Sequence, residues 1–189
     1  MASKNQNPIN LVLAASLKEL VVSRPIEKIT IKEITDRAGV IRPTFYNHFQ
    51  DKYELLEWIV ENDLFAPVDP FFANGMLKEA ITFILTTIEK EKAFYQKAVL
   101  IEGQNSFNDM FSRCVVNTIA VHLDKDKIQK MFPYKWVTVD LVADFYARAI
   151  CYGTIEWVKM GMRVPVDEMV TVFLSIFNKS VLEMISDVK

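Results

Sequence analysis

The sequence has few of the residue types from which catalytic and metal centres are usually built. Its five glycines among 189 residues are scattered, so no glycine-rich loop that could cradle a phosphate is present. It has two histidines, and His122 has only Asp124 and Asp126 nearby along the chain. His122 and Asp126 lie four residues apart, and two ligands are too few to bind a metal ion, so a surface contact between them is the favoured interpretation. We therefore predict no cofactor, no metal site and no enzymatic activity.

Cysteines and long apolar runs are also scarce. Cys114 and Cys151 lie inside apolar helical patterns, which favours buried thiols over a disulfide. No uncharged apolar run approaches the roughly 18 residues of a membrane helix. The first eight residues, MASKNQNP, are polar and contain no apolar signal segment. These absences predict a cytoplasmic protein with no membrane partner.

Charge is unevenly distributed along the chain. The overall net charge is −2, but residues 1–50 carry seven Lys and Arg against four Asp and Glu, a net charge of +3. The remaining residues carry 15 against 20, a net charge of −5. A basic end on an acidic body is typical of a protein that contacts DNA with one end only.

Apolar residues recur at helical spacing throughout, and no alternating strand pattern occurs, so the predicted fold class is all-α. Besides helices in the first 62 residues, helices are expected near 75–96, 104–123, 135–160 and 166–186. The helix that begins at Asp51 is expected to end near Asn62, where Pro67 and Pro70 interrupt helical structure and form a linker. This predicts a DNA-binding head over residues 1–62 and a helical bundle for ligand binding and dimerisation over residues 63–189.

Residues 29–56 have the plan of a helix-turn-helix. Thr30, followed three residues later by Glu33, predicts a capping box that begins a helix, and Gly39 predicts its left-handed end. A second helix is expected from Arg42 to Phe49 and a third from Asp51. Two short helices around a glycine turn are typical of a DNA-reading head.

The expected second helix has an apolar inner face and a polar outer face. Phe45 and Phe49 are four residues apart and should face the core. The outer face and its flanks carry polar groups that match DNA: Arg42 can fork onto guanine, Asn47 can bond adenine, and Thr44 offers a methyl and a hydroxyl group. Other donors can bind phosphates, namely Tyr46, His48 and Lys52. Taken alone, Arg42 and Lys52 would be ordinary surface charges.

Residues 8–60 resemble the DNA-binding head of the TetR family of bacterial one-component regulators. The matching residues are Thr30-x-x-x-Ile34, Ala38-Gly39-Val40, Thr44-Phe45-Tyr46-Asn47-His48-Phe49, Lys52 and Leu55-Leu56. The resemblance implies base contacts from Lys32, Arg42, Pro43, Thr44 and Asn47. It implies phosphate contacts from Thr30, Tyr46, His48 and Lys52. Ile41 departs from the family, which usually has a capping Ser or Asn there; the loss of such a cap costs about 1 kcal/mol.

The last two expected helices are apolar on more than one side, which favours burial on every side. Two such helices at the end of a small domain predict a symmetric homodimer built around a four-helix bundle. The candidate interface residues are Phe145, Tyr152, Gly153, Phe173 and Phe177. The segment FYARAICYGTIEWVKMGMRVPVDEM also resembles the tail of a subset of the TetR family that includes relatives of the dihydroxyacetone kinase activator.

Aromatic residues in the middle of the chain allow two interpretations. They can fill a core, or they can line a cavity for an unidentified small molecule, with Phe83, Phe107, Phe111 and Tyr146 as its candidate residues. With the resemblance, this predicts a dimeric repressor that a small, largely apolar ligand releases from an inverted-repeat operator in double-stranded DNA. The alternative is an activator, or an adapter whose body binds a partner protein rather than a small molecule.

Overall fold

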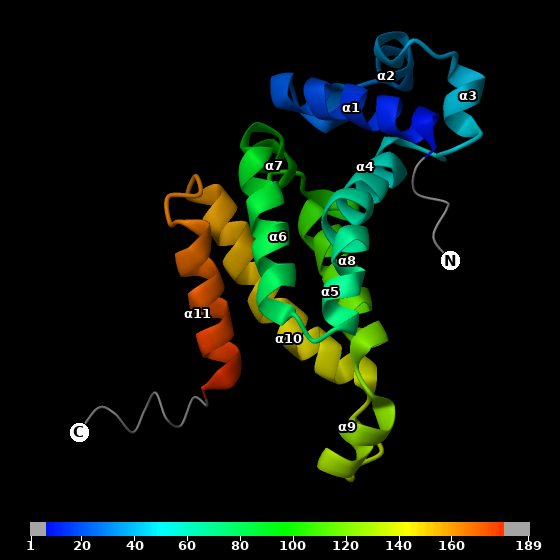
Figure 1. Cartoon of the computed structure of the whole chain (residues 1–189). Coiled ribbons are helices and arrows are strands. Elements are labelled where there is room, and N and C mark those ends of the chain that lie inside the picture. The colour runs from blue at the N-terminus through cyan, green and yellow to red at the C-terminus, as the bar shows by residue number, and fades with distance from the viewer. Residues whose placement is uncertain (1–6, 180–189) are drawn as a thin grey trace.

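The computed structural model describes residues 7–179, and within them every regular element is helical (Figure 1). The N-terminal head contains α1 (Pro8–Ser23), α2 (Ile31–Ala38), α3 (Arg42–Tyr46) and the start of α4 (Lys52–Val60). The body contains α5 (Asp69–Ala73), α6 (Leu77–Lys90), α7 (Lys92–Ala98), α8 (Phe107–His122), α9 (Lys125–Met131), α10 (Val139–Lys159) and α11 (Val166–Asn178). Over these residues no helix is long and apolar enough to cross a membrane.

The head forms around a core that its helices share. Apolar side chains from all four helices are fully buried there, among them Leu13, Leu17, Ile34, Phe45 and Leu55. Burying a Leu, Ile or Phe side chain contributes about 1.5–3 kcal/mol. Because α3 has only five residues, this shared core and not its own hydrogen bonds must hold it in place.

The chain does not leave helical structure between the head and the body, which corrects the expected linker after Asn62. The helix α4 runs directly into a π-helical turn, η2 (Glu61–Phe65), and then into a 3₁₀ turn, η3 (Ala66–Val68), and α5. Pro67 and Pro70 each lie at the start of a short helical segment, where a missing N–H is tolerated. The division between residues 62 and 63 therefore falls inside continuous helical structure and stays a prediction.

In the body, α8 packs along α10, and α11 packs against α6. The expected helix near 75–96 is two helices, because the chain bends at Glu91. The expected helix near 135–160 begins at Val139, and α9 is an additional helix that extends away from the rest of the body (Figure 1). Of the helix expected over 166–186, residues beyond 179 lie outside the described part.

The turn between α10 and α11 is fixed by Trp157. Its ring is fully buried, and its indole Nε1 donates a 2.7 Å hydrogen bond to the carbonyl oxygen of Val164. Lys92 of α7 donates a 2.7 Å hydrogen bond to the carbonyl oxygen of Gly161 in the same turn. These contacts orient α11 against the bundle, where its inner side chains reach α6.

Candidate DNA-binding face and apolar cavity

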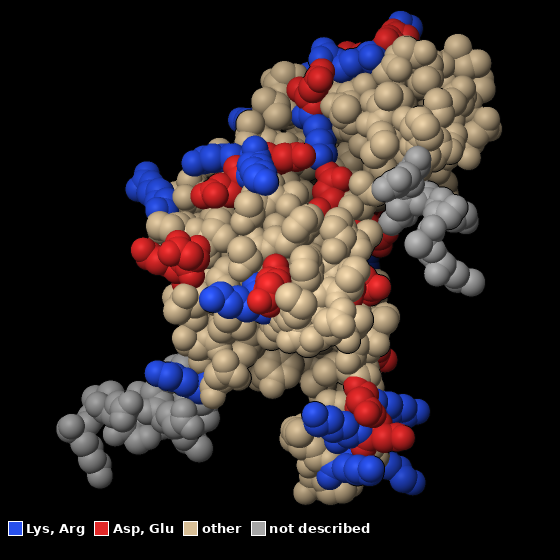
Figure 2. Space-filling view, viewed as in Figure 1, with Lys and Arg blue, Asp and Glu red and all other residues tan. Residues whose placement is uncertain are grey.

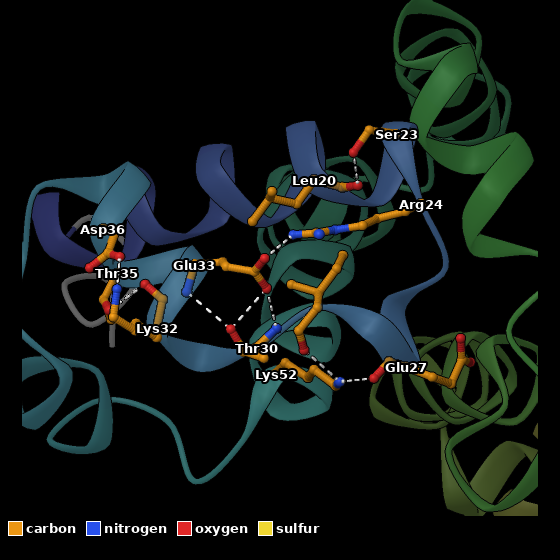
Figure 3. A network of polar contacts seen from close by, with 11 residues as sticks. Leu20, Ser23, Arg24, Glu27, Thr30, Lys32, Glu33, Thr35, Asp36 and Lys52 are labelled. Carbon is orange, nitrogen blue, oxygen red and sulfur yellow. Dashed lines mark hydrogen bonds and ion pairs between the residues drawn. The ribbon is translucent and has the colours of Figure 1, made fainter.

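The start of α2 is held by the capping box that the sequence predicts. The Thr30 hydroxyl accepts a hydrogen bond from the Glu33 backbone N–H (3.3 Å), and Glu33 Oε2 accepts one from the Thr30 backbone N–H (2.9 Å). Arg24, at the end of α1, donates a 2.6 Å hydrogen bond to Glu33 Oε1 (Figure 3). Donors from the Thr30 backbone and hydroxyl, and then from Arg24, lower the pKa of Glu33 to about 2.

The shifted pKa of Glu33 predicts a defined acid sensitivity. A carboxylate with a lowered pKa in the folded state contributes stability above its unfolded value of 4.5, and this contribution is lost as the pH falls towards 2. We expect Glu33→Gln to be less stable than the native protein at pH 7, with a difference that shrinks between pH 4.5 and 2. Denaturant unfolding of both proteins across this range measures it. A difference that is independent of pH would contradict the assignment.

The helix α3 is shorter than the expected range of Arg42 to Phe49. It ends at Tyr46, and Asn47 is its C-terminal cap; Asn47 and His48 form the turn that follows, and Phe49 comes directly after it. The backbone N–H groups of His48 and Phe49 both donate to the Phe45 carbonyl oxygen at 2.9 Å. Ile41 provides no side-chain cap, as its apolar side chain predicts. Phe45 and Phe49 are buried with their ring centroids 5.9 Å apart, so their expected role in the core is confirmed.

The outward face of α3 is open to solvent. Arg42, Pro43, Tyr46 and Asn47 are exposed, and Thr44 and His48 are partly exposed. The Tyr46 ring is 52% exposed although its edge packs on Phe45. Ile41 is 68% exposed and borders this face, which sequence analysis did not anticipate. An apolar side chain beside Arg42 matches the methyl group that thymine presents in the major groove.

Most cations of the head are paired with acids. Arg24 pairs with Glu33, Lys32 with Asp36 and Arg37 with Glu19, at 2.6–2.7 Å. Over residues 7–179, Arg42 forms no ion pair, so its guanidinium is available to a ligand. Figure 2 shows charges of both signs side by side on α9 and the upper body on the face drawn there.

Lys52 has a structural role that sequence analysis missed. Its Nζ donates hydrogen bonds to the carbonyl oxygens of Glu27 (3.1 Å) and Ile29 (2.8 Å), which fixes the connection between α1 and α2 against α4 (Figure 3). Partial burial lowers the pKa of Lys52. An ammonium group has three donors, so one remains for a phosphate. The expected phosphate contact therefore stays a prediction for Lys52, as it does for Thr30, Tyr46 and His48.

A cavity of about 410 Å³, partly open to solvent, lies in the body between α6, α8, α10 and α11. Its lining is almost entirely apolar, and its polar side chains are Thr118, His122, Tyr146 and Thr154. The other lining residues are Phe65, Phe72, Leu77, Ile81, Ile84, Leu85, Phe111, Val115, Ile119, Leu123, Ile150, Phe173 and Phe177. A cavity of this size and composition suits a small apolar molecule with few polar groups.

The cavity includes half of the expected candidate residues. Phe111 and Tyr146 line it, whereas Phe83 and Phe107 do not, which corrects the prediction for those two. The Phe83 ring packs against Phe71 with a centroid distance of 6.4 Å. Phe107 is buried and stacks on Phe111 with a centroid distance of 5.9 Å. Spacing alone could not separate these rings, because all of them lie on apolar helix faces.

His122 has different neighbours from those expected. Its Nδ1 lies 2.8 Å from the Thr118 carbonyl oxygen, its Nε2 lies 3.3 Å from Asp69 Oδ1, and its ring is 5.2 Å from that of Phe72. The acidic partner therefore comes from α5 and not from Asp126. Asp69 lies more than 50 residues before His122 in the chain, so local spacing carries no signal for this pair. Of the two residues, His122 lines the cavity.

The two cysteines are buried and unpaired, as expected. Burial raises the pKa of the Cys114 thiol to about 12 and that of Cys151 to about 11. Thiols with such pKa values remain protonated near neutral pH and are poor nucleophiles.

Two of the expected dimer residues pack inside one chain. A Cβ atom on Gly153 would lie 2.6 Å from Cε1 of Phe173, and Phe173 is buried. Phe173 and Phe177 also line the cavity. The contact between Gly153 and Phe173 joins α10 to α11. The burial of Phe173 within one chain corrects its expected place at the interface, whereas Gly153 is partly exposed and its place there stays a prediction. Phe145 and Tyr152, by contrast, are 73% and 72% exposed on α10.

Comparisons with known proteins match both parts of the chain. The profile of the family described as "Bacterial regulatory proteins, tetR family" matches residues 13–59, and that described as "Transcriptional regulator C-terminal region" matches residues 76–179. The HTH-type dhaKLM operon transcriptional activator DhaS of Lactococcus lactis subsp. lactis (strain IL1403) is 28% identical over 153 residues, which cover 79% of each chain.

Solved structures share the fold. A structure of the dihydroxyacetone kinase operon activator DhaS aligns with a TM-score of 0.61 and 24% identity, over 89% of this chain and 93% of that chain. The Thermus thermophilus FadR repressor, solved in complex with lauroyl-CoA, aligns with a TM-score of 0.61 and 17% identity. That alignment covers 91% of this chain and 94% of FadR.

Proposed function

The chain belongs to the tetR family of bacterial regulatory proteins and is a transcriptional regulator, and from this premise we propose that it binds an inverted-repeat operator as a homodimer. The observation that supports this most is the open outer face of α3, with Arg42 unpaired among residues 7–179 and Asn47 exposed. These side chains suit guanine and adenine edges in the major groove. Two heads related by a two-fold axis would read half-sites about 34–36 Å apart.

The proposed reading face predicts different effects for different residues. Asn47→Ala should relax base preference at one position of each half-site, since each bidentate base contact contributes about 1–3 kcal/mol of discrimination. Selection of binding sites from a random DNA pool measures this preference directly. The control is Asn178→Ala, an exposed asparagine at the end of α11. If both variants selected the same sites with the same affinity, the reading face would be assigned incorrectly.

We propose that the dimer forms through the exposed apolar face of α10 and α11. Leu141, Phe145 and Tyr152 of α10, and Val172 and Ile176 of α11, are all exposed large apolar residues. An exposed apolar surface of this extent in one chain is typical of an interaction site. Sedimentation of Phe145→Asp should show a monomer where the native protein sediments as a dimer, and an unchanged dimer would locate the interface elsewhere.

We further propose that a small, largely apolar ligand in the cavity releases the protein from DNA, so that it acts as a repressor. The cavity's size and apolar lining support this, and the FadR relative is a repressor solved with lauroyl-CoA, a ligand with an apolar chain. A thermal-shift screen followed by DNA titration tests the proposal. Ligands that stabilise the protein but leave its DNA affinity unchanged would disprove the coupling.

The second candidate function is activation, either directly or as an adapter whose body binds a partner protein. The observation in its favour is the relationship to DhaS, which is described as an activator. In vitro transcription from a promoter that carries the selected operator separates the two. Addition of the protein lowers transcript yield for a repressor and raises it for an activator, while an adapter changes the yield only when its partner is added.

A further inference from the structure

One lysine connects the head to two different elements of the body. Lys18 of α1 forms ion pairs with Asp63 and with Glu91, the latter at 2.6 Å to Oε2. The Lys18 and Asp63 side chains are largely shielded from solvent, and that of Glu91 is partly exposed. Lys18 Nζ also lies 5.7 Å from the centre of the Phe94 ring. Asp63 belongs to the π-helical turn η2, and Glu91 lies between α6 and α7. A single cation thus holds two acidic groups from separate elements.

Both acidic residues are attached to walls of the cavity. Phe65 lies two residues after Asp63 in the same π-helical turn, and its ring lines the cavity. Glu91 directly follows α6, which contributes Leu77, Ile81, Ile84 and Leu85 to the lining. A change in the separation of Phe65 from α6 therefore changes the separation of Asp63 from Glu91.

The geometry makes this three-residue cluster sensitive to small movements. An ammonium group can pair with two carboxylates only while both lie within about 4 Å of it, and without it the two negative charges repel each other. The π-helical turn adds a second source of sensitivity, because such turns have an extra residue per turn and are frequent at functional sites. A turn of this kind can rearrange locally without breaking the helix on either side.

We propose that Lys18 is the contact through which the cavity controls the position of the head. In the empty state Lys18 holds η2 and α6 together and fixes α1. A ligand that separates Phe65 from α6 breaks one of the two ion pairs, and α1 moves with the head. This inference rests on the proposed ligand-dependent function, and it assigns the regulation of that function to three named residues.

The position of the head can be measured without DNA. Spin labels at Ala15→Cys on α1 and Glu168→Cys on α11 report the distance between head and body by pulsed electron resonance, with labelled protein diluted into unlabelled protein. Both positions are exposed, and the native thiols are buried and protonated, so labelling is selective. The fluorescent dye 1-anilinonaphthalene-8-sulfonate serves as the probe for the apolar cavity.

The native protein should show one distance without the dye and a second population with it. Lys18→Met should populate the second distance without the dye, and the dye should then change the populations at least about threefold less than in the native protein. Glu91→Gln removes one ion pair and should give an intermediate result. The matched control is Arg37→Met, which removes a cation whose partner Glu19 lies inside the head.

Three results would overturn the proposal. They are a native distance that the dye does not alter, a Lys18→Met protein that behaves like the native one, and an Arg37→Met protein that behaves like Lys18→Met. Titration with the selected DNA measures affinity, and it distinguishes a failure of the Lys18 proposal from a failure of the proposed function. If the dye weakens DNA binding about tenfold in the native protein and in Lys18→Met alike, the function stands and Lys18 does not carry the coupling. If the native protein binds no DNA, the distances still decide the role of Lys18.

Discussion

Phe45→Ala is expected to destabilise the head by about 3–5 kcal/mol and to abolish DNA binding. The Phe45 ring is fully buried between α3 and the rest of the head core, and truncation of such a ring leaves a cavity that the short helix cannot close. The five residues of α3 then have too few contacts to remain helical. Circular dichroism melting should show a separate, early transition for the head, while the body keeps its native transition.

The neighbouring residue provides the control. Tyr46→Ala removes a ring that is half exposed, so we expect a stability change below about 1 kcal/mol with a clear loss of DNA affinity at every sequence. The two variants distinguish a residue that stabilises the head, Phe45, from one that is proposed to contact DNA, Tyr46, on the same short helix. If Tyr46→Ala bound DNA as tightly as the native protein, its proposed phosphate contact would be refuted. A single shared transition in Phe45→Ala would show that head and body unfold together.

Gly153→Leu is expected to destabilise the body by about 1–3 kcal/mol or more, through overpacking. A Cβ atom alone would lie 2.6 Å from Cε1 and 3.0 Å from Cζ of Phe173, so the ring of Phe173 has to move. The free space beside that ring is the cavity, which Phe173 lines. The variant should therefore lose affinity for cavity ligands as well as stability, measured by urea unfolding and by dye binding.

A compensating substitution makes this prediction specific. Phe173→Ala removes the ring that the new side chain would meet, so the double variant should be more stable than the sum of the two single effects by about 0.5–3 kcal/mol. Ala93→Leu, an exposed position on α7, controls for the added side chain and should change stability by no more than about 0.5 kcal/mol. Strictly additive effects of the two substitutions would contradict the contact.

Features that depend only on residues close together in the chain could be predicted from the sequence. Thr30 and Glu33 are three residues apart, and the capping box they form requires nothing from the rest of the chain. The buried pair Phe45 and Phe49 followed from helical spacing, even though α3 ends at Tyr46. The Lys52 contacts were not predictable in this way, because Glu27 and Ile29 are more than 20 residues away in the chain.

The cavity shows the same limit at the level of helix packing. Phe107 and Phe111 are four residues apart on α8 and follow the same pattern, yet only Phe111 lines the cavity. Gly153 was expected at the dimer interface, but the side chain that it packs against, Phe173, belongs to the same chain. The packing of the whole bundle decides which helix packs against which face. The residues of one helix therefore do not predict which of its apolar side chains will line the cavity.

The buried thiols of Cys114 and Cys151 are poor targets for oxidation. Peroxides attack the thiolate, and with a pKa of about 11 or 12 only about one thiol in ten thousand, or fewer, is ionised near neutral pH. The folded protein should therefore keep the same affinity for DNA during a burst of peroxide as before it. Under the proposed control by a cavity ligand, oxidation of these two thiols then adds no second signal to the response.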